Sequence, residues 1–416
     1  MKLAVIVEYF PPRMGSDRRI YELMRRLSGK NEVEFLVVPS FRESIGLTAR
    51  SGTNGSNLSL EKEHARIRVH RIDTPRALGK LWKRSFYVAY MLSMLILEWK
   101  IIQKTLKIKP DILIVNYPSV YTGLLGFLAA KLGRRVFVTD FSDLIAQYTV
   151  ELLGIHGSRL LTRALVLVQD MIVKNSDGII SVTDYLRNYA IKIGGKAKEI
   201  SVVPNGCDLT VFDHNVHSDY REKLALNSKK VCMYCGRLDN WAGSNIILEV
   251  AKKFEDRNDD VSFVVVGNQE KRRFKTPNIV ALDETEQSEL PKIMRIADVM
   301  IVPFPKSDVS EAASPIKLFE AMAMKKTVVA SRVAGIEEVM TDGLNGLLVE
   351  PADSKGWVDR ICLALDSTER SKKIGGKALE TVRNNYQWQQ LADRLEHCLT
   401  RILALKGKRT AKMSNT

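Results

Sequence analysis

The sequence predicts an α/β protein of two Rossmann-like domains, each built on a doubly wound parallel sheet. Three observations predict this fold. The chain has 416 residues, which is too long for one ordinary core and fits two halves of roughly 200 residues. Short apolar runs typical of buried strands alternate with amphipathic segments. The same alternation starts again after Asn205 and Gly206, so we expect two parallel sheets with helices on both faces.

The apolar runs place the expected strands. In the first half they are 3–7, 33–38, 111–116, 135–140, 178–183 and 199–204. In the second half they are 230–235, 261–267, 278–282, 298–303, 326–331 and 346–350. Amphipathic patterns predict helices at 18–28, 244–254, 315–324 and 388–405. Doubly wound sheets bind ligands outside the carboxyl ends of their strands, so we expect the chemistry in a crevice between two such sheets.

The composition fits an ordinary globular protein of a reducing compartment. Hydrophobic residues make up 45% and charged residues 27%, which excludes a disordered chain. The apolar run at 3–7 is followed by Glu8, so we interpret it as a strand and not as a signal peptide. Five cysteines favour the cytoplasm over a disulfide framework. Cys232 and Cys235 form a C-x-x-C inside an apolar run, which favours two thiols in a strand over a zinc site.

The net charge of +15 is concentrated in one segment. Residues 66–109 contain eleven Lys or Arg against Asp73 and Glu98, and these basic flanks enclose the apolar stretch 85–99. A basic rim around an apolar helix suggests an anionic membrane surface, with the protein peripheral on the inner face of the cell membrane. A helix buried in the first domain, with solvated charged flanks, explains the pattern equally well. A nucleic-acid partner is not expected, because a basic-aromatic motif is lacking.

The loops that follow the expected strands exclude two cofactor classes and indicate an anion site. Neither the G-x-G-x-x-G of a dinucleotide site nor a P-loop motif occurs. Gly15 and Ser16 instead precede the first helix, where backbone N–H groups can approach a phosphate. A plain turn is the alternative for Gly15. Arg237 follows the strand 230–235, where its guanidinium could hold a diphosphate or pair with a surface carboxylate.

The segment Ser314 to Glu320 carries the clearest signal in the second half. Pro315 suits the first turn of a helix whose apolar face is formed by Ile316, Leu318, Phe319 and Met322. Lys317 and Glu320 are three positions apart and share the other face. If that face meets the crevice, Lys317 can neutralise phosphate and Glu320 can accept hydrogen bonds from a ribose diol. A surface ion pair is the alternative.

Four segments together resemble the family 4 retaining glycosyltransferases of the GT-B fold. They are 9–28 (YFPPRMGSDRRIYELMRRLS), 202–212 (VVPNGCDLTVF), 236–238 (GRL) and 314–353, in the family's order and spacing over nearly the whole chain. The resemblance implies an acceptor domain at 1–207, a nucleotide-sugar donor domain at 208–385, and at 386–416 a helix returning to the first domain plus a basic tail. It implies that Asn205 and Gly206 shape the crossover and that Trp388 begins the returning helix.

The resemblance also implies roles for single residues. Arg237 would hold the donor diphosphate, Glu320 would bind the nucleotide ribose, and Gly15 with Ser16 would let the backbone approach the phosphates. The donor-binding segment would include Ser314, Pro315 and Lys317. No metal and no other cofactor is implied, because side-chain cations and helix N-termini stabilise the departing diphosphate.

The sequence departs from the family pattern at three places. Ala312 stands eight positions before Glu320, where the family has its first glutamate, and Glu311 is one place off. Ala242 stands where a lysine is common before Gly243, and Lys317 is expected to supply that charge. The remaining departure concerns the first domain.

In the first domain, Ser142 replaces the histidine of a common His-Asp pair, and Asp143 remains. We therefore take Arg237, Lys317 and Asp143 as the candidate catalytic residues. The expected reaction transfers a sugar from a nucleotide-diphosphate sugar to a glycan or lipid-linked acceptor with retention of configuration, as in polysaccharide biosynthesis. A non-catalytic scaffold of a glycan-assembly complex and a nucleotide-sugar epimerase are the alternatives.

Overall fold

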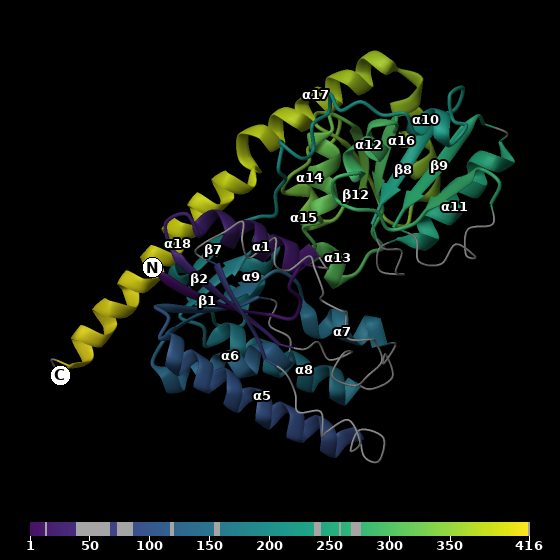
Figure 1. The fold of residues 1–416 in the computed structure, drawn as a ribbon. Helices are drawn as coiled ribbons and strands as arrows, with labels where there is room; N and C mark the ends of the chain where they lie inside the picture. The colour runs from purple at the N-terminus through teal and green to yellow at the C-terminus, as the bar shows by residue number, and fades with distance from the viewer. Residues whose placement is uncertain are drawn as a thin grey trace. The chain divides into compact units, whose positions relative to one another are not determined.

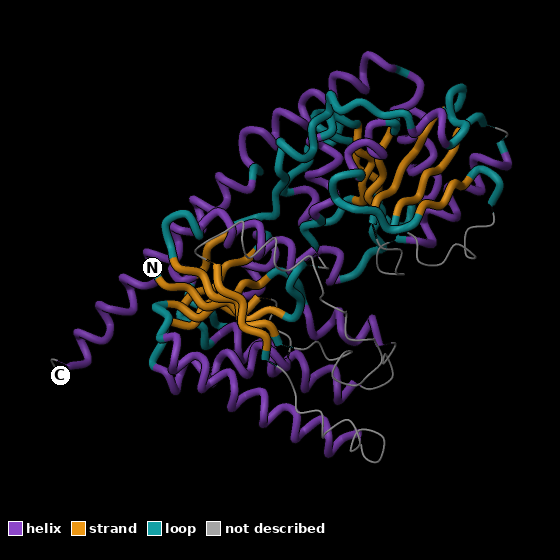
Figure 2. The backbone as a smooth tube through the Cα atoms, in the orientation of Figure 1, coloured by secondary structure: helices purple, strands orange, loops and turns teal. Residues whose placement is uncertain are grey.

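The structure is a computed structural model that describes residues 1–12, 15–38, 67–72, 86–116, 120–153, 159–236, 243–257, 259–267 and 276–414. Contacts within the chain divide it into two compact units. The first unit consists of Met1–Val203 with Leu391–Thr416, and the second of Pro204–Gln390. Each unit contains one twisted sheet with helices packed on it (Figure 1 and Figure 2).

The first unit has a seven-stranded parallel sheet in the order β3-β2-β1-β4-β5-β6-β7. Its strands are β1 (Lys2–Val7), β2 (Glu32–Val37), β3 (Ile67–Arg71), β4 (Ile112–Asn116), β5 (Val136–Phe141), β6 (Gly178–Ser181) and β7 (Ile200–Val202). Six of them were expected from their apolar runs. β3 was not, because its sequence IRVHR alternates apolar with basic residues at the edge of the sheet.

The helices of the first unit connect these strands. They are α1 (Gly15–Leu27), α5 (Phe86–Ile108), α6 (Val120–Gly133), α7 (Ile145–Leu153), α8 (Arg159–Lys174), α9 (Asp184–Lys192), the 3-10 helix Ala197–Glu199, and α18 (Trp388–Ser414). Helices α5, α6 and α8 lie on the same side of the sheet (Figure 1). Leu97, Ile101, Leu125 and Ile172 from these three helices share one apolar core with β1, β2, β4 and β5.

Helix α5 contains most of the apolar stretch at 85–99, and its packing supports the interpretation as a core helix for one side of the helix. One side of the helix buries Leu97 and Ile101 against the sheet, as expected of a core helix. Another side leaves Leu95 and Trp99 exposed. Among the helices that the structure describes, none combines the length and the apolar character that a membrane span requires.

The second unit has a six-stranded parallel sheet in the order β10-β9-β8-β11-β12-β13. Its strands are β8 (Lys230–Cys235), β9 (Val261–Val266), β10 (Ile279–Leu282), β11 (Val299–Val302), β12 (Thr327–Ser331) and β13 (Leu347–Val349). Its helices are α10 (Tyr220–Lys223), α11 (Ser244–Asp256), α12 (Leu290–Arg295), α13 (Asp308–Ala312), α14 (Ile316–Ala323), α15 (Ala334–Glu337), α16 (Ser354–Asp366) and α17 (Thr368–Asn385). Two doubly wound parallel sheets confirm the predicted fold class.

The strand order marks the place where doubly wound sheets generally bind ligands. In the first sheet β1 lies between β2 and β4, and in the second sheet β8 lies between β9 and β11. Chain order reverses at these two strands, so the carboxyl ends of β1 and β8 are the topological switch points. Any site of each unit is expected in the loops that follow them.

The C-x-x-C motif is part of β8, and both thiols are buried. Burial raises the pKa of the Cys235 thiol well above its ordinary value. The charge of Glu320 raises it further, and the charge of Lys317 opposes the change. Both cysteines are free thiols of the sheet interior, which confirms the interpretation of the motif as part of a strand.

Helix α18 begins at the buried Trp388 and packs from Leu391 onward with the first unit. A Cβ atom on Gly178, the first residue of β6, would lie 2.3 Å from Cδ1 of Ile402 on α18. The close approach of helix and strand therefore depends on a residue without a side chain. Asn31 adds a hydrogen bond of 2.8 Å to Glu396 of the same helix.

Two neighbouring glycines of α17 test how closely this helix packs. A Cβ atom on Gly375 would lie 2.3 Å from the carbonyl oxygen of Lys325, whereas one on Gly376 would meet nothing within 4 Å. We expect Gly375→Ala to lower the free energy of unfolding by about 1–3 kcal/mol, because a backbone atom must move. Gly376→Ala is the matched control and should raise it by about 0.5–1 kcal/mol. Urea denaturation measures both, and equal effects would contradict the packing described.

Candidate functional site

The first candidate region lies at the switch point of the first sheet. Gly15 and Ser16 begin α1, directly in the connection that follows β1. Asn116, the last residue of β4, donates a hydrogen bond of 3.4 Å from its side-chain amide to the carbonyl oxygen of Ser16. This contact fixes the first turn of α1 beside the ends of β1 and β4. The N-terminus of this helix carries a partial positive charge and suits an anion.

A buried ion pair fixes the neighbouring strand to the same helix. Arg19 of α1 is 0% exposed and Asp140 of β5 is 2% exposed. Nε of Arg19 lies 3.2 Å from both carboxylate oxygens of Asp140, and Nη2 lies 3.1 Å from Oδ1. The guanidinium fork thus locks the carboxyl end of β5 to α1.

Asp143 stands three residues beyond Asp140, between β5 and α7. Burial raises the pKa of Asp143 to about 7, and the charge of Asp140 adds to this, whereas the charge of Arg19 opposes it. A carboxyl group with this pKa exists in both protonation states near neutral pH, as a group that moves a proton requires.

In the second unit, Lys317 is held at the carboxyl end of β8. Its Nζ donates a hydrogen bond of 2.6 Å to the hydroxyl of Tyr234, which is buried in β8. The ammonium also lies 4.3 Å from the centroid of the Tyr234 ring and 5.8 Å from that of Phe304. Two aromatic rings and a hydroxyl therefore hold this cation in one place.

Gly236 makes room for this arrangement. Its φ is 140°, and a Cβ atom there would lie 2.8 Å from Nζ of Lys317 and 3.3 Å from the Tyr234 hydroxyl. A side chain at this position would displace the ammonium. The lysine thus reaches the backbone at the point where the chain leaves β8. Arg237, the next residue, and Ala242 lie outside the described residues.

The helix that carries Lys317 has the form expected for 315–324. Pro315 is its N-terminal cap residue, and Leu318, Phe319 and Met322 are buried in the core of the second unit. The side-chain amide of Asn205 donates a hydrogen bond to the carbonyl of Ser314 and so fixes the entry into α14. The crossover segment thereby positions the candidate donor helix.

Glu320 is 5% exposed and Lys317 is half-buried. The alternative of a surface ion pair between them is therefore wrong. The two side chains are three residues apart on α14, as the sequence predicts, and the carboxylate of Glu320 is buried in the second unit.

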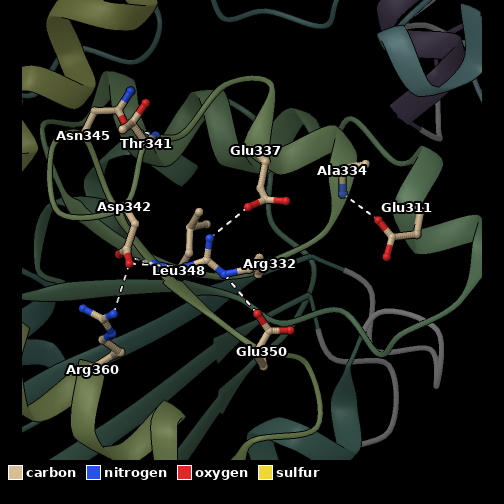
Figure 3. Close-up of polar contacts among 10 residues, drawn as sticks. All are labelled: Glu311, Arg332, Ala334, Glu337, Thr341, Asp342, Asn345, Leu348, Glu350 and Arg360. Carbon is tan, nitrogen blue, oxygen red and sulfur yellow. Dashed lines mark hydrogen bonds and ion pairs between the residues drawn. The ribbon is translucent and has the colours of Figure 1, made fainter. Parts of the chain in front are cut away.

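The carboxylate nearest to the missing family glutamate has a structural partner. Glu311 of α13 accepts a hydrogen bond of 2.7 Å from the backbone N–H of Ala334, the first residue of α15 (Figure 3). A carboxylate at a helix N-terminus satisfies an otherwise unbonded amide and offsets the helix dipole. Ala312, one residue later, is fully buried.

The segment after β12 is braced by charges that Figure 3 shows together. Arg332 lies 2.9 Å from Glu337, 3.3 Å from Asp342 and 3.1 Å from Glu350. The hydrogen bond to Glu337 and the surrounding carboxylates raise the pKa of Arg332. This cluster joins α15, the turn at 341–346 and β13, so it stabilises the segment that follows the candidate donor helix.

The N-terminus of α11 lies beside the end of β11. Gly243, with φ of 80°, precedes α11, and a Cβ atom there would lie 2.1 Å from the carbonyl oxygen of Pro303, just after β11. The first turn of α11 is thus pressed against the carboxyl edge of the sheet. The N-terminus of such a helix carries a partial positive charge.

Within the part of the chain that the structure describes, no group of three or more His, Cys, Asp or Glu side chains is placed to hold a metal ion. The absence of a metal requirement stays a prediction. Three residues of the candidate regions were not predicted from the sequence: Tyr234, Arg19 and Asp140. The apolar run 230–235 identifies Tyr234 only as a strand residue. Arg19 and Asp140 are far apart in the sequence, so no motif or spacing indicates that they form an ion pair.

The raised pKa of Asp143 predicts a pH-dependent stability. In the unfolded chain the Asp143 carboxyl has a pKa near 3.8, whereas in the folded state its pKa is about 7. Between these values the folded state keeps a proton that the unfolded state has released. The carboxyl therefore destabilises the fold increasingly as the pH rises toward 7. We expect Asp143→Asn to gain roughly 2 kcal/mol relative to the wild type between pH 5 and pH 8. Urea denaturation at several pH values measures the difference. Ser142→Ala, which removes no charge, should show no such trend, and a pH-independent effect of Asp143→Asn would contradict the assignment.

Comparison with family models matches both halves of the chain. Residues 14–206 match the glycosyl transferase 4-like domain, and residues 229–367 match the glycosyl transferases group 1. A lipopolysaccharide 1,2-N-acetylglucosaminetransferase of Salmonella typhimurium is 30% identical over 218 residues, which cover 48% of this chain and 56% of that protein. The aligned region thus spans little more than half of this relative. An uncharacterized glycosyltransferase of Methanocaldococcus jannaschii is 20% identical over 94% of this chain and 96% of its own.

Solved structures agree with the fold. HepE of Anabaena, crystallised with UDP-glucose, is similar with a TM-score of 0.69 at 18% identity, over 96% of this chain and 99% of that chain. Sucrose-phosphate synthase of Thermosynechococcus elongatus is similar with a TM-score of 0.73 at 18% identity, over 97% and 99% of the two chains. At these identities the likeness establishes the architecture alone. The chain has two parallel sheets and matches both family models in order. It therefore belongs to the GT-B superfamily of glycosyltransferases and resembles its family 4 members.

Proposed function

We propose that this protein is a glycosyltransferase that moves a sugar from a nucleotide-diphosphate sugar to a glycan or lipid-linked acceptor with retention of configuration. The observation that carries the proposal is the fixed ammonium of Lys317 at the carboxyl end of β8, with Glu320 buried three residues later on the same helix. This is the switch point of the second sheet, where a doubly wound fold binds its ligand.

In this proposal the second unit binds the donor. Lys317 and Arg237 neutralise the diphosphate, and the N-terminus of α11 adds its partial charge. Glu320 accepts hydrogen bonds from the ribose hydroxyls. Ser314 and Pro315 hold the first turn of α14 in place, through the bond from Asn205.

The chemical step is the departure of the nucleoside diphosphate. Negative charge grows on the diphosphate as the bond to the sugar breaks, and cations already in position stabilise that charge without reorganising. The anchoring of Lys317 by Tyr234 and Phe304 supplies this preorganisation. The acceptor hydroxyl attacks from the face that the diphosphate leaves, and no divalent ion is required.

The first unit contributes the remaining proposed residues. Gly15 and Ser16 bring backbone N–H groups at the N-terminus of α1 toward the phosphates. Asp143, with a pKa near 7, takes up the proton of the acceptor hydroxyl or donates a hydrogen bond to the sugar. We place the protein in the cytoplasm or peripherally on the inner face of the cell membrane.

The names of similar proteins suggest which donors to test first. One relative is named a lipopolysaccharide 1,2-N-acetylglucosaminetransferase, and several others are named D-inositol 3-phosphate glycosyltransferases. HepE was crystallised with UDP-glucose. UDP-glucose and UDP-N-acetylglucosamine are therefore the first donors of a thermal-shift screen, followed by GDP- and ADP-sugars. A ligand that binds the folded state raises the unfolding temperature.

A non-catalytic scaffold that binds a nucleotide is the second candidate. It is favoured by the state of Glu311, whose carboxylate caps α15 while Ala312 fills the place of the family's first glutamate. Such a protein would bind nucleoside diphosphate but release none from a nucleotide sugar. Assay of diphosphate release, with and without acceptor, separates the two candidates, and an isomerised donor would instead identify an epimerase.

Two substitutions test the pair Lys317 and Glu320, which we call the donor clamp. We expect Lys317→Ala and Glu320→Ala each to lower kcat/KM for the correct donor by roughly a hundredfold or more, because each removes a group in contact with the donor. Lys373→Ala and Glu369→Ala on α17 remove the same types of residue from exposed positions and should leave kcat/KM unchanged. Full activity of either clamp variant would disprove the site.

Tyr234→Phe tests the anchor of Lys317 and not its charge. The variant keeps the aromatic ring and loses the hydrogen bond of 2.6 Å. We expect kcat to fall roughly tenfold with little change in stability, because the ammonium loses its fixed position. If Tyr234→Phe lowered stability and left kcat intact, the hydroxyl would be a structural group of the core.

A further inference from the structure

Exposed large apolar side chains gather on one part of the first unit. Nine are exposed among the side chains that the structure describes, and seven of these lie on α5, α6 and α8. They are Leu95, Trp99 and Leu106 on α5, Leu132 on α6, and Leu160, Leu167 and Met171 on α8. Soluble surfaces carry such residues singly, so a gathering on three adjacent helices marks an interaction surface.

On α5 the exposed apolar residues form a stripe. Leu95, Trp99 and Leu106 lie on one side of the helix, together with the exposed polar residue Gln103, because these four positions are separated by four, four and three residues. Trp99 is 61% exposed. The residues that bury α5 on the sheet, such as Leu97, occupy a different side, so the stripe is no part of the core.

The stripe continues across the neighbouring helices. A Cβ atom on Gly133, at the end of α6, would lie 3.7 Å from Cδ2 of Leu106, so the two helices touch beside Leu132. On α8, Leu160 and Leu167 are 82% and 69% exposed and lie two turns apart on one side. All three helices pack their inner sides on the same face of the sheet (Figure 1). Their outer sides therefore form one surface, which we call the α5-α6-α8 face.

A basic groove borders this face. It has a volume of about 560 Å³ and lies between the edge strand β3 and α5. Its polar lining consists of His70, Arg71, Lys100, Gln103, Lys104 and Lys107. Gln103 belongs both to the stripe and to the groove, so the apolar and the basic surfaces are continuous.

The charge of the three helices has one predominant sign. Together they contain seven Lys or Arg against Glu98 and Asp170. Asp170 accepts a hydrogen bond of 2.7 Å from the hydroxyl of Tyr189 on α9, so its charge is directed to that helix. The α5-α6-α8 face thus combines exposed Leu and Trp side chains with an excess of positive charge.

We propose that the α5-α6-α8 face docks on an anionic lipid bilayer. Leucine and tryptophan side chains enter the interface between headgroups and acyl chains, and the lysines of the groove bind lipid phosphates. A second copy of the chain would also cover the apolar stripe, but it would bring two basic faces together. The inference rests on this surface and not on the donor site. With the proposed function, it makes a membrane-borne acceptor the substrate class.

Vesicle flotation of the full chain tests the proposal. We expect it to float with vesicles of phosphatidylcholine and phosphatidylglycerol at about 0.1 M salt, and to bind pure phosphatidylcholine or at about 1 M salt much more weakly. Trp99→Glu and Leu167→Glu should each lower binding at least about tenfold. Leu344→Glu, an exposed leucine of the second unit, is the matched control and should bind like the wild type.

The basic groove has its own pair of variants. Lys104→Gln with Lys107→Gln should lower binding to anionic vesicles roughly thirtyfold, because each basic residue near such a surface contributes about 1 kcal/mol. The double change Lys372→Gln and Lys373→Gln on exposed positions of α17 removes the same charge and should have no effect. Equal losses from both pairs would mean attraction by net charge alone and would overturn the docking face.

Fluorescence quenching by brominated acyl chains locates the contact. Trp99 should contribute to the quenching that vesicles cause, so Trp99→Phe should lower it while the protein still floats. Sedimentation velocity without vesicles shows whether Trp99→Glu instead dissociates a dimer, which would assign the face to a second copy and overturn the proposal. Urea transitions confirm that each variant is folded. Diphosphate release from the donor, assayed separately, keeps failure of the docking face distinct from failure of the proposed function.

Discussion

The contact between the Lys317 ammonium and Tyr234 is the interaction on which the second unit's candidate site depends. It joins the candidate donor helix α14 to the carboxyl end of β8, and Gly236 leaves room for the ammonium at that point. The same helix begins where Asn205 binds the carbonyl of Ser314. The ammonium of Lys317 is thus held by contacts from β8, and the helix that carries it is held by the crossover segment. Its position is therefore more fixed than that of an ordinary surface lysine.

In the first unit, an ion pair between Arg19 and Asp140 holds a helix against the end of a strand. Arg19 and Asp140 are both buried, and their pairing keeps α1 and β5 in register at the switch point. Burial of two charges is costly unless each is bonded, so this pair contributes geometry more than stability. Asp143 stands three residues beyond Asp140. Burial raises the pKa of Asp143 to about 7, while the charge of Arg19 lowers it and the charge of Asp140 raises it.

Much of the architecture could be predicted from the sequence, and particular residues explain where prediction stopped. Buried parallel strands are apolar along their whole length, so strands such as 230–235 are visible as runs. β3 was not predicted, because an edge strand needs no continuous apolar run and the sequence IRVHR alternates apolar with basic residues. The helix of Lys317 and Glu320 was predictable from Pro315 and its periodicity. The anchoring by Tyr234 was not, since nothing in a strand's pattern tells which end residue meets a helix far along the chain.

Because it includes helix α18, the first unit is formed by two separate segments of the chain. Residues 391 onward complete its packing, with Ile402 set against Gly178, whereas the second unit is formed by the continuous stretch Pro204–Gln390. During synthesis the ribosome therefore releases all of the second unit before the first unit has its last helix. The part made first is finished last, and until then the surface around Gly178 stays open to water and to chaperones.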